Sequence, residues 1–290
     1  MFAIFGKAVN PKHYPSYQFF FDCLKELKMD YQVEEKFAAI LVQNNIAFNQ
    51  KTYRQFDSIA HEIEMLMTLG GDGTILEAIT FIQRFETPIL GINFGRLGFL
   101  ANVGKEELKN SLELIDKGKY IVENRSLLSL NTNKGIFANC PFALNEMTIQ
   151  RKDQSSMITI HTYLNGELLN SYWADGLIIA TPSGSTGYSL SCGGPILYPS
   201  SDNFVITPVA PHNLNVRPIV VADDVVLSFE VTGRNDSFLC TLDSRFESID
   251  SSVQIAIKKA DFGVKLIRLS DANFISALKT KLFWGLDGRN

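Results

Sequence analysis

The sequence has few cysteines, no long apolar run and no excess of charge of one sign. Its 290 residues include four cysteines, and 27 basic side chains are nearly balanced by 31 acidic ones, which leaves a net charge of −4. A membrane-spanning helix needs roughly 18–20 consecutive apolar residues, and a nucleic-acid backbone requires a basic surface. Because the sequence offers neither, we expect no membrane and no nucleic acid among its partners.

The cysteines and histidines are too scattered to form a metal site of their own. Cys23, Cys140, Cys192 and Cys240 contain no CxxC pair, and the four histidines show no HxxxH or HExxH spacing, so we expect no protein-built metal site. Four cysteines in a chain of this length do not indicate a disulfide scaffold, and no cleavable signal sequence is visible. These observations predict reduced thiols and a cytoplasmic location.

Three common active-site motifs are also missing. The sequence contains no GxxxxGK[ST] loop, no GxGxxG dinucleotide fingerprint and no GxSxG elbow. These absences exclude a Walker-type phosphate loop, a standard dinucleotide-binding turn and a serine hydrolase of the elbow type. The functional signal therefore has to come from other segments.

The hydrophobic pattern changes near residue 120. Before that point, short buried strands (2–5, 63–69 and 88–92) alternate with helical spacing (17–27 and 75–85), which predicts a parallel sheet covered on both faces. After it, short alternating runs are separated by turn signals such as Asn165-Gly166, which predict antiparallel sheets packed on one another. The pattern of residues 36–57 fits no single element.

We therefore expect an α/β domain with a parallel, Rossmann-like sheet, followed by an all-β, sandwich-like domain of antiparallel sheets. The α/β domain is expected to span residues 1–115, and the β-rich domain residues 116–269. The segment of about 270–290 is again apolar and aromatic, with Phe274, Leu278 and Trp284. We expect that segment to pack back on the first domain.

A glycine-rich turn, Gly70-Gly71-Asp72-Gly73-Thr74, joins a predicted strand to the helix that follows it. Backbone N–H groups and the positive end of the helix suit an anion there, and phosphate is the natural occupant. A tight turn capped by Asp72 is the simpler alternative, but a cap needs no third glycine. A carboxylate in a phosphate cradle either manages magnesium or accepts a proton from an attacking hydroxyl.

Two further glycine-rich segments also follow predicted strands. For the segment 91–98, an ordinary turn is an equal alternative. The segment 175–195 contains many hydroxyl groups and glycines as well as Tyr188. Hydroxyls and bare backbone suit phosphate, ribose and purine edges, and a tyrosine suits stacking. A flexible linker is the alternative, which the packed run 177–180 directly before the loop disfavours.

A polar pair, Asn145-Glu146, interrupts the otherwise apolar run 142–149. Neighbouring residues on a strand point to opposite faces, so we expect one of the two to face inward. Buried polar groups cost free energy unless they are bonded, which favours a ligand contact. Solvation at an open sheet edge is the alternative.

Together these segments resemble the NAD kinase family, within the larger group that includes diacylglycerol and sphingosine kinases. The resemblance covers roughly the stretch from Met65 to Arg245. The family's GGDGT, NE and DGxxxATPxGSTAYxxSxGGP motifs match Gly70–Thr74, Asn145-Glu146 and Asp175–Pro195, except that Gly187 stands where alanine is usual. In addition, Asn93–Leu100 is similar to the family's NxGxLGFL, and Pro208–Val221 to its strand-and-turn region.

The resemblance implies transfer of the γ-phosphoryl group of ATP to the 2′-hydroxyl of the adenosine ribose of NAD, giving NADP. It implies that Asp72 is the catalytic residue and that Mg²⁺ arrives with ATP. It makes 1–115 the nucleotide-binding domain and 116–269 the NAD-binding domain. The implied binding residues are Gly71, Gly73, Thr74, Asn145, Glu146, Asp175, Ser183, Thr186, Gly187 and Tyr188. The resemblance places Asp175 at the nicotinamide end of NAD and Ser183, Thr186, Gly187 and Tyr188 around the adenosine. Arg217 and Arg245 are weaker candidates for binding the phosphate charge.

The resemblance also implies a homodimer or homotetramer. Two alternatives differ in function. A lipid kinase with the same phosphate loop would need a basic amphipathic helix or polybasic cluster to reach a membrane, and we find neither. A noncatalytic NAD- or NADP-binding sensor is disfavoured by the intact Asp72. ATP, other nucleotides and polyphosphate all stay candidates as the phosphoryl donor, and NADH stays a candidate acceptor.

Overall fold

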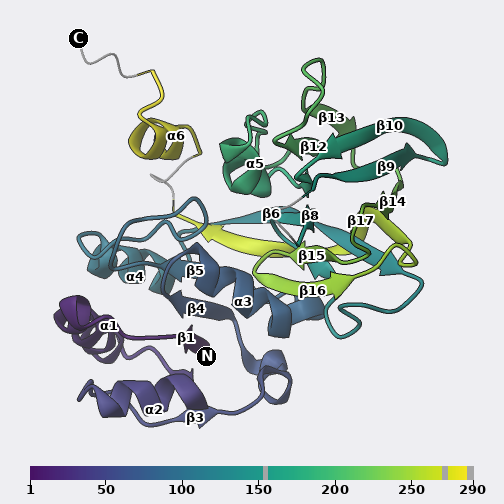
Figure 1. Cartoon of the computed structure of the whole chain (residues 1–290). Helices are drawn as coiled ribbons and strands as arrows, with labels where there is room; N and C mark the ends of the chain where they lie inside the picture. Colours follow the sequence, from purple (N-terminus) through teal and green to yellow (C-terminus); the bar gives the residue numbers. More distant parts are fainter. Residues whose placement is uncertain (153–155, 270–273, 286–290) are drawn as a thin grey trace. The chain divides into compact units, whose positions relative to one another are not determined.

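The computed structural model describes residues 1–152, 156–269 and 274–285. Backbone contacts divide the chain into two compact units, Met1–Asn124 with Val264–Asn290 and Arg125–Gly263. The chain passes from one unit to the other within two long strands, β6 (Ile121–Thr132) and β17 (Ile255–Arg268) (Figure 1).

The first unit is built on a parallel sheet whose strand order is β5-β4-β1-β2-β3. These strands are β1 (Phe2–Gly6), β2 (Tyr31–Glu34), β3 (Thr52–Tyr53), β4 (Met65–Leu69) and β5 (Ile89–Ile92). The end of β17 joins the edge, where Leu266 pairs in parallel with Ile89. Every residue of β1, β4 and β5 is buried, as expected for parallel strands that are covered on both faces.

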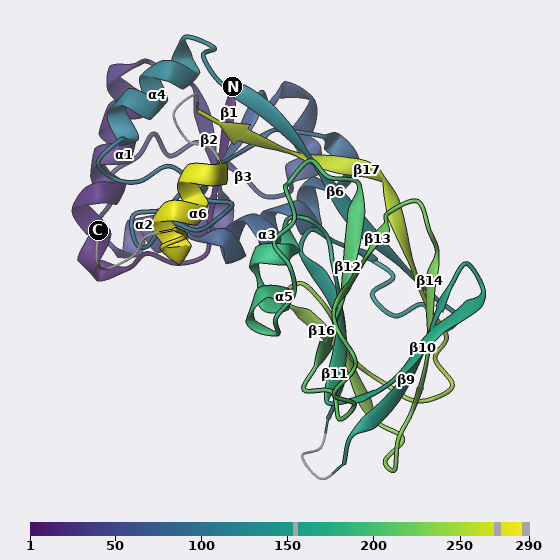
Figure 2. The ribbon, with the colours of Figure 1, turned by 90° about the horizontal axis from the view of Figure 1, so that it is seen from above.

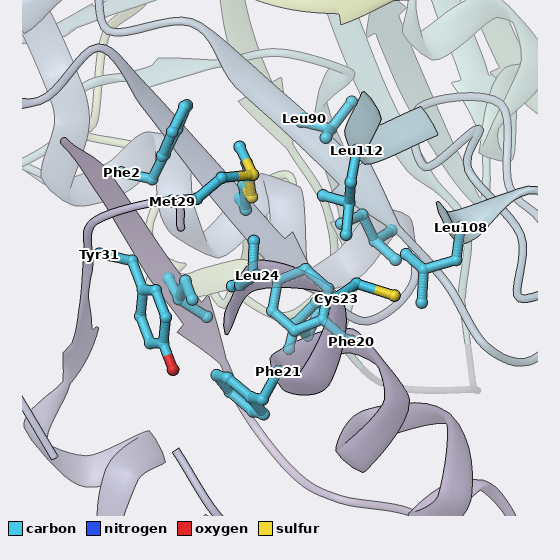
Figure 3. Close-up of a cluster of buried hydrophobic side chains, with 14 of the residues drawn as sticks. Phe2, Phe20, Phe21, Cys23, Leu24, Met29, Tyr31, Leu90, Leu108 and Leu112 are labelled. Atoms are coloured by element: carbon cyan, nitrogen blue, oxygen red, sulfur yellow. The ribbon is translucent and has the colours of Figure 1, made fainter. Parts of the chain in front are cut away.

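One face of this sheet packs against three helices, α1 (Tyr14–Glu26), α2 (Glu35–Gln43) and α4 (Leu108–Asp116). Figure 3 shows Phe20 and Phe21 of α1 and Leu112 of α4 directed into one buried cluster with Phe2 and Leu90 of the strands. This cluster is the core of the first unit.

The opposite face is covered by α3 (Asp72–Ile82). The ring centroids of Phe5 in β1 and Phe81 in α3 are 4.9 Å apart. Gly91 of β5 lies so close to α3 that a Cβ atom there would be 2.6 Å from Cδ1 of Ile75. Helices on both faces confirm the predicted doubly covered α/β sheet.

The other elements of the first unit are the short 3-10 helices η1 (Pro11–His13), η2 (Phe56–Ser58), η3 (Ala60–Glu62) and η4 (Gln83–Phe85), together with α6 (Phe274–Leu282). The ambiguous stretch 36–57 contains α2 and β3. α6 contacts this unit through Phe274, whose ring centroid is 6.4 Å from that of Phe99. Residues 270–273 and 286–290 of the segment expected to pack back lie outside the described residues. In the described part of the chain, no helix has the length and apolar character needed to cross a membrane.

The second unit contains a six-stranded antiparallel sheet in the order β13-β12-β11-β8-β15-β16. Its strands are β8 (Glu146–Arg151), β11 (Gly176–Ala180), β12 (Asn203–Val209), β13 (Ile219–Ala222), β15 (Phe238–Leu242) and β16 (Arg245–Ile249). Two short helices, η5 (Gly184–Thr186) and α5 (Tyr188–Ser191), follow β11.

A second layer of this unit is formed by β10 (Glu167–Ala174), β9 (Ile158–Leu164), β14 (Leu227–Thr232) and the first part of β17, which pair antiparallel in that order. β6 pairs with β17 and with the short strand β7 (Phe142–Ala143). Figure 2 shows β9, β10 and β14 side by side. Ile179 and Phe204 of the six-stranded sheet share one core with Ile160 and Phe229 of the second layer, which confirms the sandwich-like antiparallel prediction.

Two local predictions have different outcomes. Asn165 and Gly166, with φ of 50° and 87°, join β9 to β10 in a tight hairpin as predicted. By contrast, the apolar run 142–149 is not one strand, because it breaks between β7 and β8. The reason is that the N–H groups of Leu144 and Asn145 bond to the carboxylate of Asp243 rather than to a neighbouring strand.

Candidate active site

The predicted phosphate loop is the turn from β4 into α3, with Gly71 at the N-cap of the helix. The turn is tight: a Cβ atom on Gly70 would lie 2.2 Å from Oγ1 of Thr74. Thr74 is buried, and its N–H donates to the Gly71 carbonyl at 2.8 Å. The N–H of Thr74 is therefore used inside the turn, and the expected anion contacts fall to the other N–H groups of the first helical turn.

The Asp72 carboxylate does not cap α3, so the simpler alternative of a capping aspartate is wrong. Instead, Oδ2 accepts the N–H of Phe99 at 2.8 Å, and Oδ1 accepts the N–H groups of Leu100 at 3.1 Å and Ala101 at 2.8 Å. Three donors fix both oxygens. The glycine-rich segment after β5 is therefore more than a connecting turn, because it orients the carboxylate of the phosphate loop.

In the second unit, the Asn145-Glu146 pair is anchored by Asp243 in the turn between β15 and β16. The Asp243 carboxylate accepts the N–H groups of Leu144, Asn145 and Glu146 at 2.9, 2.8 and 3.2 Å. Its own N–H donates to the Glu146 carbonyl at 3.0 Å. Burial raises the pKa of Asp243, while its hydrogen bonds and the nearby Arg245 act in the opposite direction. In the sequence, Asp243 stands in an Asp-Ser-Arg run that is typical of a turn, so nothing local marks it as the anchor of this pair.

The side chains of this pair carry two buried oxygens, Oδ1 of Asn145 and Oε2 of Glu146, that have no hydrogen-bond partner among the described residues. Burial, and secondarily the charge of Asp243, raises the pKa of Glu146 to about 8. The carboxyl group is therefore mostly protonated at neutral pH, which makes it a hydrogen-bond donor as well as an acceptor. Unpaired buried oxygens contradict the alternative of a pair solvated at a sheet edge, and they favour a ligand contact.

The loop after β11 lies against this pair. A Cβ atom on Gly184 would be 2.1 Å from the Asn145 carbonyl oxygen, and one on Gly187 would be 3.3 Å from Oε2 of Glu146. The Thr181 N–H donates to the Asn145 carbonyl at 2.9 Å. Within the loop, the Thr186 hydroxyl donates to the Ser183 carbonyl at 3.2 Å. The structure thus brings the second and third predicted motifs together.

Two other predicted residues, Asp175 directly before β11 and Tyr188 at the start of α5, have partners that sequence reasoning missed. Gln150 Nε2 donates to the Tyr188 hydroxyl at 3.0 Å. The guanidinium of Arg151 forms a bidentate ion pair with Asp175, in which Nε is 3.0 Å from Oδ1 and Nη2 is 3.1 Å from Oδ2. The sequence did contain a signal for these contacts. Gln150 and Arg151 are polar residues at the end of the apolar run that carries Glu146.

The two arginines considered for phosphate charge are engaged elsewhere. Arg245 donates to the carbonyl oxygens of Cys140 and Phe142. Arg217 Nη1 donates to the carbonyls of Leu214 at 2.6 Å and Val216 at 2.8 Å. The guanidinium of Arg245 therefore holds the backbone before and within β7, and that of Arg217 holds the backbone of its own turn. Within 1–152, 156–269 and 274–285, no group of three or more His, Cys, Asp or Glu side chains is placed to hold a metal ion.

Comparison with known proteins decides the family. Residues 10–120 match the ATP-NAD kinase N-terminal domain, and residues 144–269 match the ATP-NAD kinase C-terminal domain. The chain belongs to the NAD kinase family. It is accordingly an NAD kinase, an enzyme that uses ATP.

Relatives match the chain over its whole length. The NAD kinase of Cytophaga hutchinsonii is 44% identical over 292 residues and covers 100% of both chains. That of Flavobacterium psychrophilum is 47% identical over 293 residues, covering 99% of both.

Two solved structures share the NAD kinase fold. Yeast NADH kinase complexed with NADH has a TM-score of 0.87 at 21% identity, covering 99% of this chain and 88% of that one. An NAD kinase from Archaeoglobus fulgidus in complex with ATP has a TM-score of 0.71 at 24% identity, covering 93% and 95%.

Proposed function

We propose that the chain transfers the γ-phosphoryl group of ATP to the 2′-hydroxyl of the adenosine ribose of NAD, releasing NADP and ADP. The observation that carries this proposal is the fixed carboxylate of Asp72 in the turn before α3. An ionised carboxylate has about four acceptor positions, and three of them take N–H groups of residues 99–101. The position left over suits the ribose hydroxyl.

In the reaction, the 2′-oxygen attacks the γ-phosphorus as the bond from that phosphorus to the bridging oxygen of the β-phosphate breaks. The hydroxyl proton passes to Asp72 and ADP leaves with the electron pair of the broken bond. Phosphoryl transfer depends mainly on positioning and charge neutralisation. The rigid hold on Asp72 supplies the positioning of the attacking oxygen.

The ATP phosphates bind at Gly71 and Gly73, where the N-terminus of α3 offers N–H groups and a positive partial charge. Thr74, whose own N–H is used inside the turn, contributes its hydroxyl. Magnesium would be brought with ATP and would neutralise charge on the phosphate oxygens. Mg²⁺ commonly keeps several waters and binds through substrate phosphates, so it would need no position on Asp72, whose free acceptor position is assigned to the ribose hydroxyl.

NAD binds through the second unit. The unpaired Oδ1 of Asn145 accepts a hydrogen bond from the nucleotide, and the protonated carboxyl of Glu146 donates one. Ser183, Thr186, Gly187 and Tyr188 surround the adenosine, and Asp175, held by Arg151, lies at the nicotinamide end. We accordingly assign ATP to the domain 1–115 and NAD to the domain 116–269.

The test is to incubate the purified protein with ATP, magnesium and NAD, and to locate the new phosphate by ³¹P NMR of the product. We expect NADP carrying a 2′-phosphate, with one ADP formed for each NADP. Saturable NAD binding without product would favour the sensor, and phosphorylation of diacylglycerol in a parallel assay would favour the lipid kinase. Either result would overturn the proposal.

Assembly and location are part of the proposal. Leu168 and Trp173 of β10 expose 56% and 49% of their surface, which is apolar area that a second copy would cover in a homodimer or homotetramer. Light scattering during size exclusion tests this. All four cysteines are free, which supports a cytoplasmic location.

A further inference from the structure

The C-terminal helix α6 places a lysine against the segment that holds Asp72. Its last turn carries two basic residues, Lys279 and Lys281. Nζ of Lys281 lies over the ring of Phe99, 5.0 Å from the centroid, and the ring of Phe274 packs on the same side chain. Phe99 therefore receives contacts from both ends of α6.

Phe99 is also the residue whose N–H binds Oδ2 of Asp72 at 2.8 Å. Phe99 thus connects the two groups, because its backbone N–H binds the carboxylate of the phosphate loop and its ring lies under the ammonium group of Lys281. Burial lowers the pKa of Lys281, while the negative charge of Asp72 acts on it in the opposite direction. Lys279, two residues earlier on the same helix, is exposed.

The phosphate loop has no positively charged side chain of its own, and Lys281 can supply one. The turn 69–74 contains no basic residue and one acidic residue, and the nearby Lys7 is paired with Glu77 of α3. A triphosphate is a polyanion, and the chain as a whole carries a net charge of −4, so attraction must come from local groups. An ammonium that is already partly desolvated on an aromatic ring gives up little hydration when it binds an anion.

We propose that Lys281 is a phosphate-binding residue, and that α6 delivers its ammonium group to the polyphosphate chain held at residues 70–74. This inference rests on the proposed use of that turn for the phosphates of ATP. The alternative is that Lys281 only anchors α6 by packing on Phe99.

Three variants separate the two roles. Lys281→Met keeps an unbranched apolar side chain for the ring of Phe99 but removes the charge, and Lys281→Arg keeps the charge. Lys279→Met is the matched control, because it removes an exposed charge from the same turn of α6. Each protein is titrated with ATP, tripolyphosphate and NAD by calorimetry, and its thermal melting is recorded.

We expect Lys281→Met to weaken ATP and tripolyphosphate binding by roughly ten- to a hundredfold, the range for one charge-assisted hydrogen bond. NAD affinity stays unchanged, Lys281→Arg restores most of the loss, and Lys279→Met behaves as the wild type. Full tripolyphosphate affinity in Lys281→Met, or an equal loss in Lys281→Arg, would overturn the inference.

Two further outcomes are separated by the design. If Lys281→Met unfolds at a lower temperature than the wild type, Lys281→Gln is compared with Lys281→Arg at a temperature at which both are folded. Equal tripolyphosphate affinity of these two variants contradicts the proposal. Tripolyphosphate binding is independent of turnover. A protein that binds it through Lys281 but forms no NADP would refute the proposed reaction and leave the phosphate site intact.

Discussion

Gly98 and Asp72 are packed so closely that no side chain fits between them. A Cβ atom built on Gly98 would lie 1.8 Å from Oδ1 of Asp72 and 2.2 Å from its Cγ. The three backbone N–H groups that hold the carboxylate belong to the residues directly after this glycine. The backbone can approach Asp72 because residue 98 has no side chain, and this approach fixes the proposed catalytic group.

The first prediction is that Gly98→Ala displaces the Asp72 carboxylate while the sheet stays folded. Because a misplacement of about 1 Å can cost on the order of a hundredfold in rate, we expect kcat to fall by about that factor with the KM for NAD unchanged. Steady-state kinetics measure both. Gly104→Ala is the control, since its nearest neighbour, Leu97 Cδ1, is 3.6 Å away. Equal kcat values in the two variants would contradict the positioning role.

The second prediction compares two glycines of the loop after β11. Gly184→Ala forces a methyl group against the Asn145 carbonyl at 2.1 Å, and backbone atoms there have little room to yield. We expect it to lower the free energy of unfolding by about 1–3 kcal/mol and to weaken NAD binding.

Gly187→Ala is the matched variant, because its new methyl group is 3.2 Å from the Gly184 carbonyl and 3.3 Å from Oε2 of Glu146. A shift of a few tenths of an ångström relieves these contacts, so we expect near-wild-type melting and a NAD affinity within a few-fold. Thermal melts and NAD titrations would contradict the account if the two variants behaved alike.

The third prediction concerns pH and Glu146, whose pKa is raised from 4.5 to about 8. Below about pH 4.5 the Glu146 carboxyl group is protonated in both the folded and the unfolded chain, so no free energy is lost by burying a charge. As pH rises toward 8 the unfolded chain releases its proton first, and stability falls until the folded chain ionises too. Glu146→Gln removes this loss, so it becomes more stable than the wild type with rising pH, by on the order of a few kcal/mol.

Denaturant unfolding at pH 5, 7 and 9 measures the effect. Glu167→Gln on β10 is the control, because it neutralises an exposed carboxylate and leaves the pH dependence as in the wild type. A Glu146→Gln curve parallel to that of the wild type over the whole range would show that the carboxyl group is not buried as described.

The fourth prediction tests the anchoring of Asp175 by Arg151. Arg151→Met frees Asp175, so we expect the KM for NAD to rise several-fold. The melting temperature changes little, because a partly exposed ion pair contributes at most about 1 kcal/mol. Lys152→Met removes the neighbouring charge, whose Nζ is 3.2 Å from Ser248 Oγ, and serves as the control. Unchanged KM values for NAD in Arg151→Met would remove Asp175 from the NAD site.

Much of the fold is predictable because local patterns and tertiary contacts agree. The buried runs that became β1, β4 and β5 are continuous and apolar, as parallel strands covered on both faces are, and Asn165-Gly166 dictates its hairpin through positive φ. The secondary structure of the stretch 36–57 could not be predicted, because α2 is short and β3 has two residues. Elements of this length are too short to establish a hydrophobic period.

The candidate site was predictable as motifs but not as contacts. The spacing of Gly70–Thr74 marks a phosphate turn, yet the partners of Asp72 are 27 to 29 residues away in the chain. Asp243 looks like a turn residue in the sequence. Its role of binding the backbone of residues 144–146 depends on partners that are 97 to 99 residues away in the chain. Lys281 is invisible to any local pattern, because only folding brings α6 to Phe99.

The most direct test of the central claim is the turnover of Asp72→Asn. Its carboxamide keeps the size of the side chain but accepts no proton, so we predict that NADP formation falls roughly a hundredfold to ten-thousandfold. NAD affinity, which depends on the second unit, stays near that of the wild type. The melting temperature falls somewhat, because the amide nitrogen of Asn cannot accept the N–H of Phe99. A folded Asp72→Asn protein that binds NAD and makes NADP at close to the wild-type rate would contradict the account.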